Sequence, residues 1–177
     1  QKNKRAILAA YFTMKEVKRN KVIFVCSGNI CRSPMGEALL KHAIAATDPN
    51  DPVRKLEVCS AGISTVDGML PSAHSIEALA KVGIDINSYR STALTQKLVD
   101  EAFAVFAMDT THIDAMKARF DNLPKRLFRV LDMAENAEDK NVPDPYGGNL
   151  REYLQVRDEI ASAIGGILKY LQNETKN

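Results

Sequence analysis

The run CSGNICRSP, which begins at Cys26, brings a thiol, a guanidinium and a hydroxyl close together in the chain. A cysteine thiolate is a nucleophile, and the planar guanidinium of Arg32 can bind two oxygens of one phosphate. Gly28 and Asn29 permit left-handed backbone, so the segment can curl with its N–H groups turned inward around an anion. Those dipoles and Arg32 would favour the thiolate form of Cys26, and the Ser33 hydroxyl can donate toward its sulfur. The run predicts a phosphate-binding loop with a nucleophile at its floor.

The same residues have a plainer interpretation. Taken alone, Cys26 is a buried thiol at a strand end, and Arg32 is a surface charge beside a helix. The setting favours the chemical interpretation, because an apolar run precedes the cysteine and Ser33-Pro34 has the form of a helix start. A nucleotide-binding P-loop is excluded, because this loop does not end in Gly-Lys-Ser/Thr.

A second chemical group follows near the C-terminus, in the segment Pro143-Asp144-Pro145-Tyr146. Phosphoryl transfer to a thiolate needs an acid that protonates the departing atom. The two prolines restrict the backbone around Asp144, which makes it a candidate for that acid; the alternative is an ordinary Asp-Pro turn. Tyr146 could stack on an aromatic substrate, or it could be a loop aromatic that is partly buried.

The elements that must hold these groups alternate between strands and helices. Apolar, β-branched runs predict buried strands over residues 21–26, 56–60, 102–108 and 127–131. Helical spacing predicts helices after Ser33, between Ser72 and Gly83, and from Leu150 onward, the last despite the helix-weakening pair Gly165-Gly166. We therefore expect a single-domain α/β fold: an open, parallel, four-stranded sheet flanked by helices, doubly wound and flavodoxin-like. In such sheets ligands bind beyond the carboxyl ends of the strands, where the loop after residue 26 lies.

Composition sets the broad class. The chain has 177 residues, of which 45% are apolar and 26% charged, and its net charge is +2. These values are typical of one globular domain, and they predict neither a nucleic-acid nor a membrane partner. The odd count of three cysteines favours free thiols in a reducing compartment, so we expect a cytoplasmic protein.

The chain is expected to divide into an N-terminal extension, residues 1–20, and a domain over residues 21–177. The chain begins at Gln1, so it is expected to be truncated or processed, with Met14 as one candidate start. Its apolar stretch, residues 6–12, is too short to span a membrane, and although basic residues precede it as in a signal peptide, no small-residue cleavage site follows. The extension is therefore expected to be flexible or helical.

The run from Val25 to Met35 closely resembles the phosphate-binding signature of the low-molecular-weight protein tyrosine phosphatases. The resemblance extends from about residue 22 to the C-terminal helix and includes Ser60-Ala61-Gly62, Ala107-Met108-Asp109 and, most diagnostically, Asp144-Pro145-Tyr146-Gly147. It implies a cysteine-dependent protein phosphatase that works through a cysteinyl-phosphate intermediate and without a cofactor. We expect hydrolysis of protein phosphotyrosine.

The resemblance also assigns roles to residues. Catalysis would rest on Cys26, Arg32, Ser33 and Asp144, the last acting as general acid and then activating water. The phosphate would be bound by Ser27, Gly28, Asn29, Ile30, Cys31 and Arg32, with Ile30 and Tyr146 lining the substrate cleft. Cys31 would guard Cys26 against over-oxidation through a reversible disulfide, with a small packed side chain as the alternative. Asp109 would have a supporting role near the loop, and Cys59 is expected in the core.

The sequence departs from the family pattern at several positions. Many members have a Ser-His pair that braces the loop asparagine, whereas this chain has Ser88-Tyr89-Arg90 there. The sequence leaves open whether Tyr89 supplies an equivalent hydrogen bond to Asn29. An aromatic wall residue is replaced near Val66, and Gly147 stands where a second tyrosine is common. The spacing resembles a bacterial subgroup with protein-arginine phosphatases, which carry threonine where this loop has Ile30. Isoleucine offers only apolar surface, which favours phosphotyrosine.

Other functions are weaker candidates. Arsenate reductases use a similar loop but need further cysteines, and none follows Cys59. A binding module that has lost turnover would not need Asp144. His42, His74 and His112 have no metal-ligand spacing, so no metal is expected. The expected partner is a phosphorylated protein, a tyrosine kinase being one candidate, and the expected state is a monomer or a weak dimer.

Overall fold

The computed structural model describes residues 17–176, so most of the expected N-terminal extension lies outside the described residues. The strands are β1 (Lys21–Cys26), β2 (Glu57–Gly62), β3 (Ala102–Ala107) and β4 (Leu127–Arg129). The helices are α2 (Arg32–Ala45), α3 (Ala73–Ala80), α4 (Gln96–Asp100), α5 (Thr110–Arg119) and α6 (Leu150–Thr175), with short 3-10 helices η1 (Pro52–Lys55) and η2 (Val130–Met133).

The four strands form one parallel sheet in the order β2-β1-β3-β4, which confirms the predicted sheet. The first strand of the chain is therefore an interior strand, and the chain reverses direction across the sheet at β1. The beginning of this order is that of flavodoxin-like doubly wound folds. In these folds the reversal creates a crevice at the carboxyl end of β1, the end that carries Cys26.

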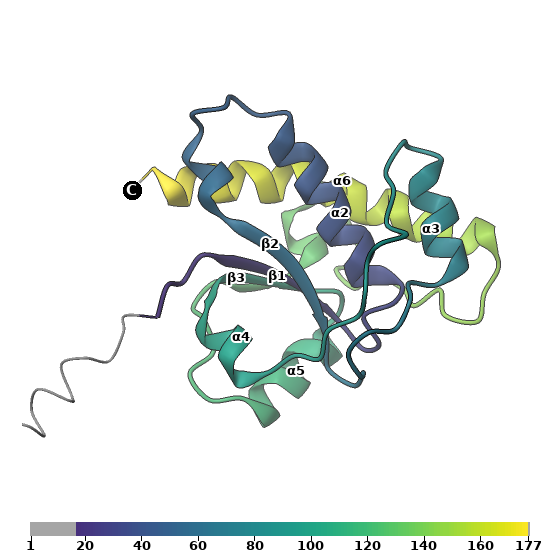
Figure 1. The fold of residues 1–177 in the computed structure, drawn as a ribbon, viewed down its shortest axis with the longest axis horizontal. Helices are drawn as coiled ribbons and strands as arrows, with labels where there is room; N and C mark the ends of the chain where they lie inside the picture. Colours follow the sequence, from purple (N-terminus) through teal and green to yellow (C-terminus); the bar gives the residue numbers. More distant parts are fainter. Residues whose placement is uncertain (1–16, 177) are drawn as a thin grey trace, which may run out of the picture.

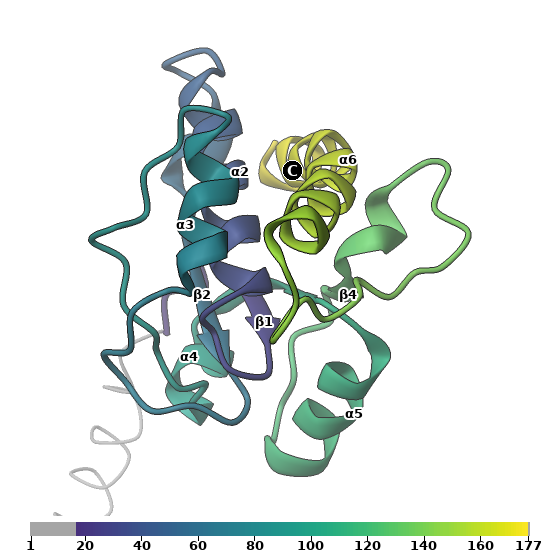
Figure 2. The ribbon, with the colours of Figure 1, turned by 90° about the vertical axis from the view of Figure 1, so that its right-hand side faces the viewer.

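The sheet is covered on both faces. Helices α2, α3 and α6 lie on one face, and α4 and α5 lie on the other (Figures 1 and 2). The alternation of side chains along β1 matches this arrangement: Val22 and Phe24 belong to the larger core cluster, while Ile23 and Val25 belong to the smaller one. All four side chains are fully buried, which explains why this strand reads as a continuous apolar run.

Several element boundaries differ from those predicted. Strand β2 runs from Glu57 to Gly62, so it ends two residues beyond the predicted strand over residues 56–60. Helix α2 begins at Arg32, with Cys31 at its N-cap and no side-chain capping bond, so Ser33 is not the cap. The fourth strand ends at Arg129, and the chain continues in the 3-10 helix η2.

The two glycines in α6 have different surroundings. A Cβ added to Gly166 would lie 2.0 Å from the backbone oxygen of Met133 in η2, whereas one added to Gly165 would meet no atom within 4 Å. Gly166 therefore permits the close approach of α6 and η2, which offsets its cost in helix propensity. The helix starts in a capping box between Asn149 and Glu152.

Candidate active site

The loop between β1 and α2 is organised around the buried side chain of Asn29. Asn29 has a φ of 53°, the left-handed conformation expected from the sequence. Its Nδ2 donates to Ser33 Oγ at 2.8 Å and to Ser60 Oγ at 3.0 Å, and its Oδ1 accepts from the backbone N–H of Thr92 at 2.7 Å. Three separate segments thus hold the loop in one conformation.

Cys26 ends the central strand and faces donors on its own loop. Its Sγ lies 2.9 Å from Ser33 Oγ and accepts from the backbone N–H of Asn29 at 3.2 Å. Both contacts suit a thiolate, because each can direct a hydrogen toward the sulfur. The side chain is almost completely buried at the bottom of the loop.

Arg32, in the first turn of α2, joins the loop to two distant segments. Its Nη1 donates to Asp109 Oδ2 at 3.0 Å and to the backbone oxygen of Val142 at 3.1 Å, and its Nη2 donates to Asp144 Oδ2 at 2.9 Å. The Arg32 side chain is 4% exposed, whereas that of Asp144 is 50% exposed. The guanidinium is thus buried and fixed by its hydrogen bonds to Asp109 and Val142, while the Asp144 carboxylate remains accessible to solvent.

These residues meet at a cleft of about 500 Å³. It is lined by Cys26, Ser27, Gly28, Ile30, Cys31, Arg32, Ser64, Thr65, Val66, Met69, Asp144 and Tyr146. Eight of the ten predicted site residues therefore line it; the other two, Asn29 and Ser33, are fully buried and contact Cys26. The sequence reasoning did not identify Ser64, Thr65 or Met69 as lining residues.

The three cysteines are free and have different surroundings. Burial raises the pKa of Cys31, whose Sγ lies 3.3 Å from Tyr153 Oη. Cys59 was expected in the core, but it is only partly buried and packs against the smaller core cluster, where burial raises its pKa to about 12. Both thiols therefore remain protonated near neutral pH.

Tyr89 supplies the brace that the sequence left open. Its hydroxyl donates to the backbone oxygen of Asn29 at 3.3 Å and lies 2.9 Å from Ser60 Oγ, which also donates to Glu37 Oε2 at 2.6 Å. Ser60 is thus part of the support of the loop, a role that its position in a strand did not reveal. His74 lies elsewhere, with its ring 5.4 Å from that of Tyr153.

His112 is a buried part of the site that sequence reasoning missed. Its Nε2 lies 2.9 Å from Ser27 Oγ, and its Nδ1 lies 3.1 Å from Asp109 Oδ1. The available signal was its position three residues after Asp109 at the start of a helix, which places the two side chains on one face. Asp109 also caps α5, because its Oδ1 accepts from the His112 backbone N–H.

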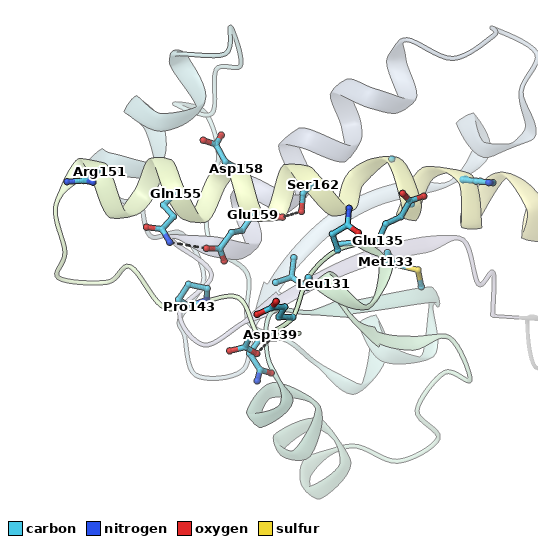
Figure 3. A pocket seen from close by; sticks show the side chains of 18 residues that line it. Leu131, Met133, Glu135, Asp139, Pro143, Arg151, Gln155, Asp158, Glu159 and Ser162 are labelled. Carbon is cyan, nitrogen blue, oxygen red and sulfur yellow. Dashed lines mark hydrogen bonds between the residues drawn. The ribbon is translucent and has the colours of Figure 1, made fainter.

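A larger hollow of about 1230 Å³ lies between α6 and residues 131–143. Figure 3 shows Gln155 and Glu159 on α6, with Leu131 and Asp139 across from them. Five carboxylates and two cationic side chains are among its lining residues, which include no cysteine or histidine. It holds no thiol beside a phosphate-binding loop, so the smaller cleft remains the candidate active site.

Within residues 17–176, none of the helices is both long enough and apolar enough to cross a bilayer. Within the same range, no group of three or more His, Cys, Asp or Glu side chains is placed to hold a metal ion.

Comparison with known proteins agrees with this geometry. The profile of the family described as low molecular weight phosphotyrosine protein phosphatase matches residues 21–177. The chain is 34% identical over 154 residues to a protein-arginine-phosphatase of Geobacillus stearothermophilus, covering 87% of this chain and 97% of that protein. It is 31% identical over 151 residues to the low molecular weight protein-tyrosine-phosphatase PtpA of Staphylococcus aureus, covering 85% and 92% of the two chains.

Solved structures show the same relationship. The YwlE arginine phosphatase from Geobacillus stearothermophilus superimposes with a TM-score of 0.75 at 32% identity, covering 88% of this chain and 94% of that chain. A low molecular weight protein tyrosine phosphatase from T. tengcongensis gives a TM-score of 0.73 at 29% identity, covering 85% and 98%. The chain therefore belongs to the low molecular weight phosphotyrosine protein phosphatase family and is a cysteine phosphatase of that family.

Proposed function

We propose that this protein dephosphorylates a protein side chain in two steps, with Cys26 as the nucleophile and Asp144 as the general acid. One observation carries the proposal: the buried guanidinium of Arg32 joins the loop that holds Cys26 to the carboxylate of Asp144. A nucleophile, a phosphate-binding cation and an acid thereby line one cleft.

In the first step the phosphoryl group occupies the loop above Cys26. The thiolate attacks phosphorus, an S–P bond forms, and the bond from phosphorus to the substrate breaks. Asp144 gives its proton to the departing atom, while Arg32 and the loop N–H groups stabilise the charge on the phosphoryl oxygens. Asp144 suits this transfer because its carboxylate is half exposed at the rim of the cleft.

In the second step Asp144, now a carboxylate, accepts a proton from a water molecule. That water attacks phosphorus, the S–P bond breaks, and inorganic phosphate leaves. The donors on Ser33 and Asn29 stabilise the Cys26 thiolate as it departs. The thiolate and the protonated acid are thereby regenerated for the next turnover.

Two substrates are candidates, and the relatives favour phosphoarginine. Two protein-arginine-phosphatases are 34% and 32% identical to this chain over 87% and 88% of its length, and the superimposed YwlE structures are arginine phosphatases. This similarity supports phosphoarginine better than phosphotyrosine, the substrate expected from the sequence. In the cleft, the carboxylate of Asp144 could pair with a guanidinium leaving group.

The cleft wall favours phosphotyrosine. Ile30, Val66 and Met69 line the cleft with apolar surface, and the exposed ring of Tyr146 stands at the same cleft. An aryl ring could pack against these side chains. The Ile30 side chain, by contrast, can form no hydrogen bond with the guanidinium of a phosphoarginine substrate or with a water molecule beside it. Relatives that are tyrosine phosphatases match a comparable share of the chain.

The reaction is tested by turnover of para-nitrophenyl phosphate in the presence of a chelator. We expect the wild type to be active, Cys26→Ser to be inactive, and Asp144→Ala to be slowed by about 10²-fold or more, the usual size of a lost general acid. Acid quenching followed by mass spectrometry should trap phosphate on Cys26 in Asp144→Ala. Full activity of Cys26→Ser would overturn the proposal.

The substrate is decided by comparing kcat/KM for phosphoarginine and phosphotyrosine in peptides of otherwise identical sequence. The comparison is then repeated with Ile30→Thr, which supplies the hydroxyl of the threonine found at this position in the bacterial subgroup with protein-arginine phosphatases. We expect this substitution to shift the ratio toward phosphoarginine. An unchanged ratio would show that Ile30 does not determine the choice, and phosphotyrosine would lose its main support.

A further inference from the structure

His112 lies where the loop after β1 meets the start of α5. It is 3% exposed, and its ring stands between the Ser27 hydroxyl and the Asp109 carboxylate. The second oxygen of Asp109 accepts from Arg32 Nη1 at 3.0 Å. A continuous series of side chains therefore leads from Ser27, next to Cys26, to the guanidinium of Arg32. The two-step reaction uses His112 in no step.

The proton on the ring can be assigned from its neighbours. Nδ1 lies 3.1 Å from Asp109 Oδ1 without the alignment of a hydrogen bond, but a carboxylate oxygen this close only accepts, so we assign the proton to Nδ1. In the neutral ring Nε2 then accepts from the Ser27 hydroxyl. Burial lowers the pKa of His112, with Arg32 acting in the same direction, while the charges of Asp109 and Asp144 oppose it. The ring is therefore neutral near pH 7.

We propose that neutral His112 is a positioning residue, which holds Ser27 directly and the guanidinium of Arg32 through Asp109. Its role rests on the proposed function, because that function makes Arg32 the phosphate-binding cation. The inference assigns His112 no contact with the substrate. It adds a second support to the loop, on the side away from the Asn29 contacts to Ser60.

The sheet explains why this support can be rigid. Strands β1 and β3 are neighbours, so the loop that follows β1 and the helix that follows β3 begin side by side. Asp109 is also fixed by capping α5. An apolar side chain in place of His112 would fill the space but would remove the protein partner of the hydroxyl of Ser27, an exposed residue.

The test measures kcat and KM for para-nitrophenyl phosphate, and Ki for inorganic phosphate, in the wild type, His112→Ala and His112→Gln. We expect His112→Ala to raise KM and Ki by about tenfold, the effect of losing a part-buried hydrogen bond at a binding group. The change in kcat should be smaller. His112→Gln should recover part of the loss, because its side-chain oxygen can accept from Ser27.

A double-mutant cycle separates positioning from general damage. If His112 acts through Ser27, the loss in kcat/KM for Ser27→Ala/His112→Ala should be smaller than the product of the two single losses. Ser27→Ala is conservative because it removes only a hydroxyl group. If His112→Ala does not fold, the cycle can be run with His112→Gln in its place. Losses that multiply would overturn the inference.

Met116→Ala is the matched control. Met116 lies on the same helix, is fully buried, and belongs to the core cluster on that face of the sheet. It should lower thermal stability without changing KM or Ki of the folded enzyme. If wild-type turnover depends on Cys26 and His112→Ala leaves KM and Ki unchanged, only the role of His112 is overturned. If Cys26→Ser remains active, the proposed function itself is overturned.

Discussion

Arg32 Nη2 lies 2.9 Å from Asp144 Oδ2, which links the first turn of α2 to the loop that precedes α6. The cation proposed to bind phosphate and the proposed acid are therefore direct partners. A phosphoryl group that enters the loop would compete with Asp144 for this donor. Asp144 would then be free to turn toward the leaving atom, so phosphate binding and proton delivery are coupled through one guanidinium nitrogen.

Arg32→Lys should be strongly impaired although the charge is kept. The two terminal nitrogens of Arg32 serve separate partners, Asp109 and Asp144, and one ammonium group cannot reproduce that fork. We expect kcat/KM for para-nitrophenyl phosphate to fall by about 10²-fold or more. Arg151→Lys, at an exposed position on α6, is the control and should match the wild type. An Arg32→Lys variant within twofold of the wild type would contradict this role.

Replacing each of the two glycines in α6 with alanine should change the free energy of unfolding in opposite directions. Gly165→Ala adds a methyl group that meets no atom within 4 Å, so helix propensity should raise the free energy of unfolding by up to about 1 kcal/mol. Gly166→Ala places its methyl group 2.0 Å from Met133 oxygen and should lower that free energy, because α6 must move away from η2. Urea unfolding of both variants measures the two changes, and equal signs would contradict the packing described for Gly166.

The three thiols should differ in their reaction with iodoacetamide at pH 7. With a pKa of about 12, Cys59 carries a thiolate fraction of only about 10⁻⁵ at this pH, and burial also raises the pKa of Cys31. Cys26, proposed to react as a thiolate, should be alkylated first, with loss of activity. Peptide mass spectrometry identifies the site, and Cys59→Ser should be inactivated at the wild-type rate. Labelling of Cys59 or Cys31 ahead of activity loss would contradict this order.

Stability should decrease as the pH falls below about 6.5, in part because of His112. Burial lowers the pKa of this ring in the folded protein, so in mild acid the unfolded chain binds a proton that the native protein does not. The free energy of unfolding should therefore rise from pH 5.5 to 7.5, and rise less in His112→Gln. The lowered pKa of Asp109 acts below about pH 3.8, outside this range. Equal slopes in urea unfolding would show that His112 makes no such contribution.

Much of the fold could be predicted because its signals are local. The fully buried run in β1 and the Ser72 cap of α3 are each contained in a short stretch of sequence. Helix α5 has a local cap, Asp109, but no apolar stripe, because it buries only His112 and Met116, and it was not predicted. The predicted fourth strand was too long, since Val130 and Leu131 are buried in the 3-10 helix η2 and look equally apolar in either conformation.

The difference between local and long-range signals also decides how much of the site could be predicted. Cys26 and Arg32 lie in one segment, so their chemistry could be predicted from residue types and spacing. The pairing of Arg32 with Asp144 spans 112 positions, and both residues were named for catalysis from the sequence without a prediction of their contact. The contact between Ser27 and His112 depends on β3 lying beside β1, which no local pattern reports. Contacts created by strand pairing were therefore the part of the site that the sequence did not reveal.

The interior position of β1 has a consequence for how the site fluctuates. Because β1 is hydrogen-bonded to β2 on one edge and to β3 on the other, its amides are divided between two ladders, and all of them exchange with solvent only after both ladders open. The backbone that carries Cys26 should therefore be among the last to acquire deuterium, while the loop around Tyr146 exchanges early. The nucleophile is anchored in the slowest-opening part of the molecule, and the acid approaches it from a segment that can open on its own.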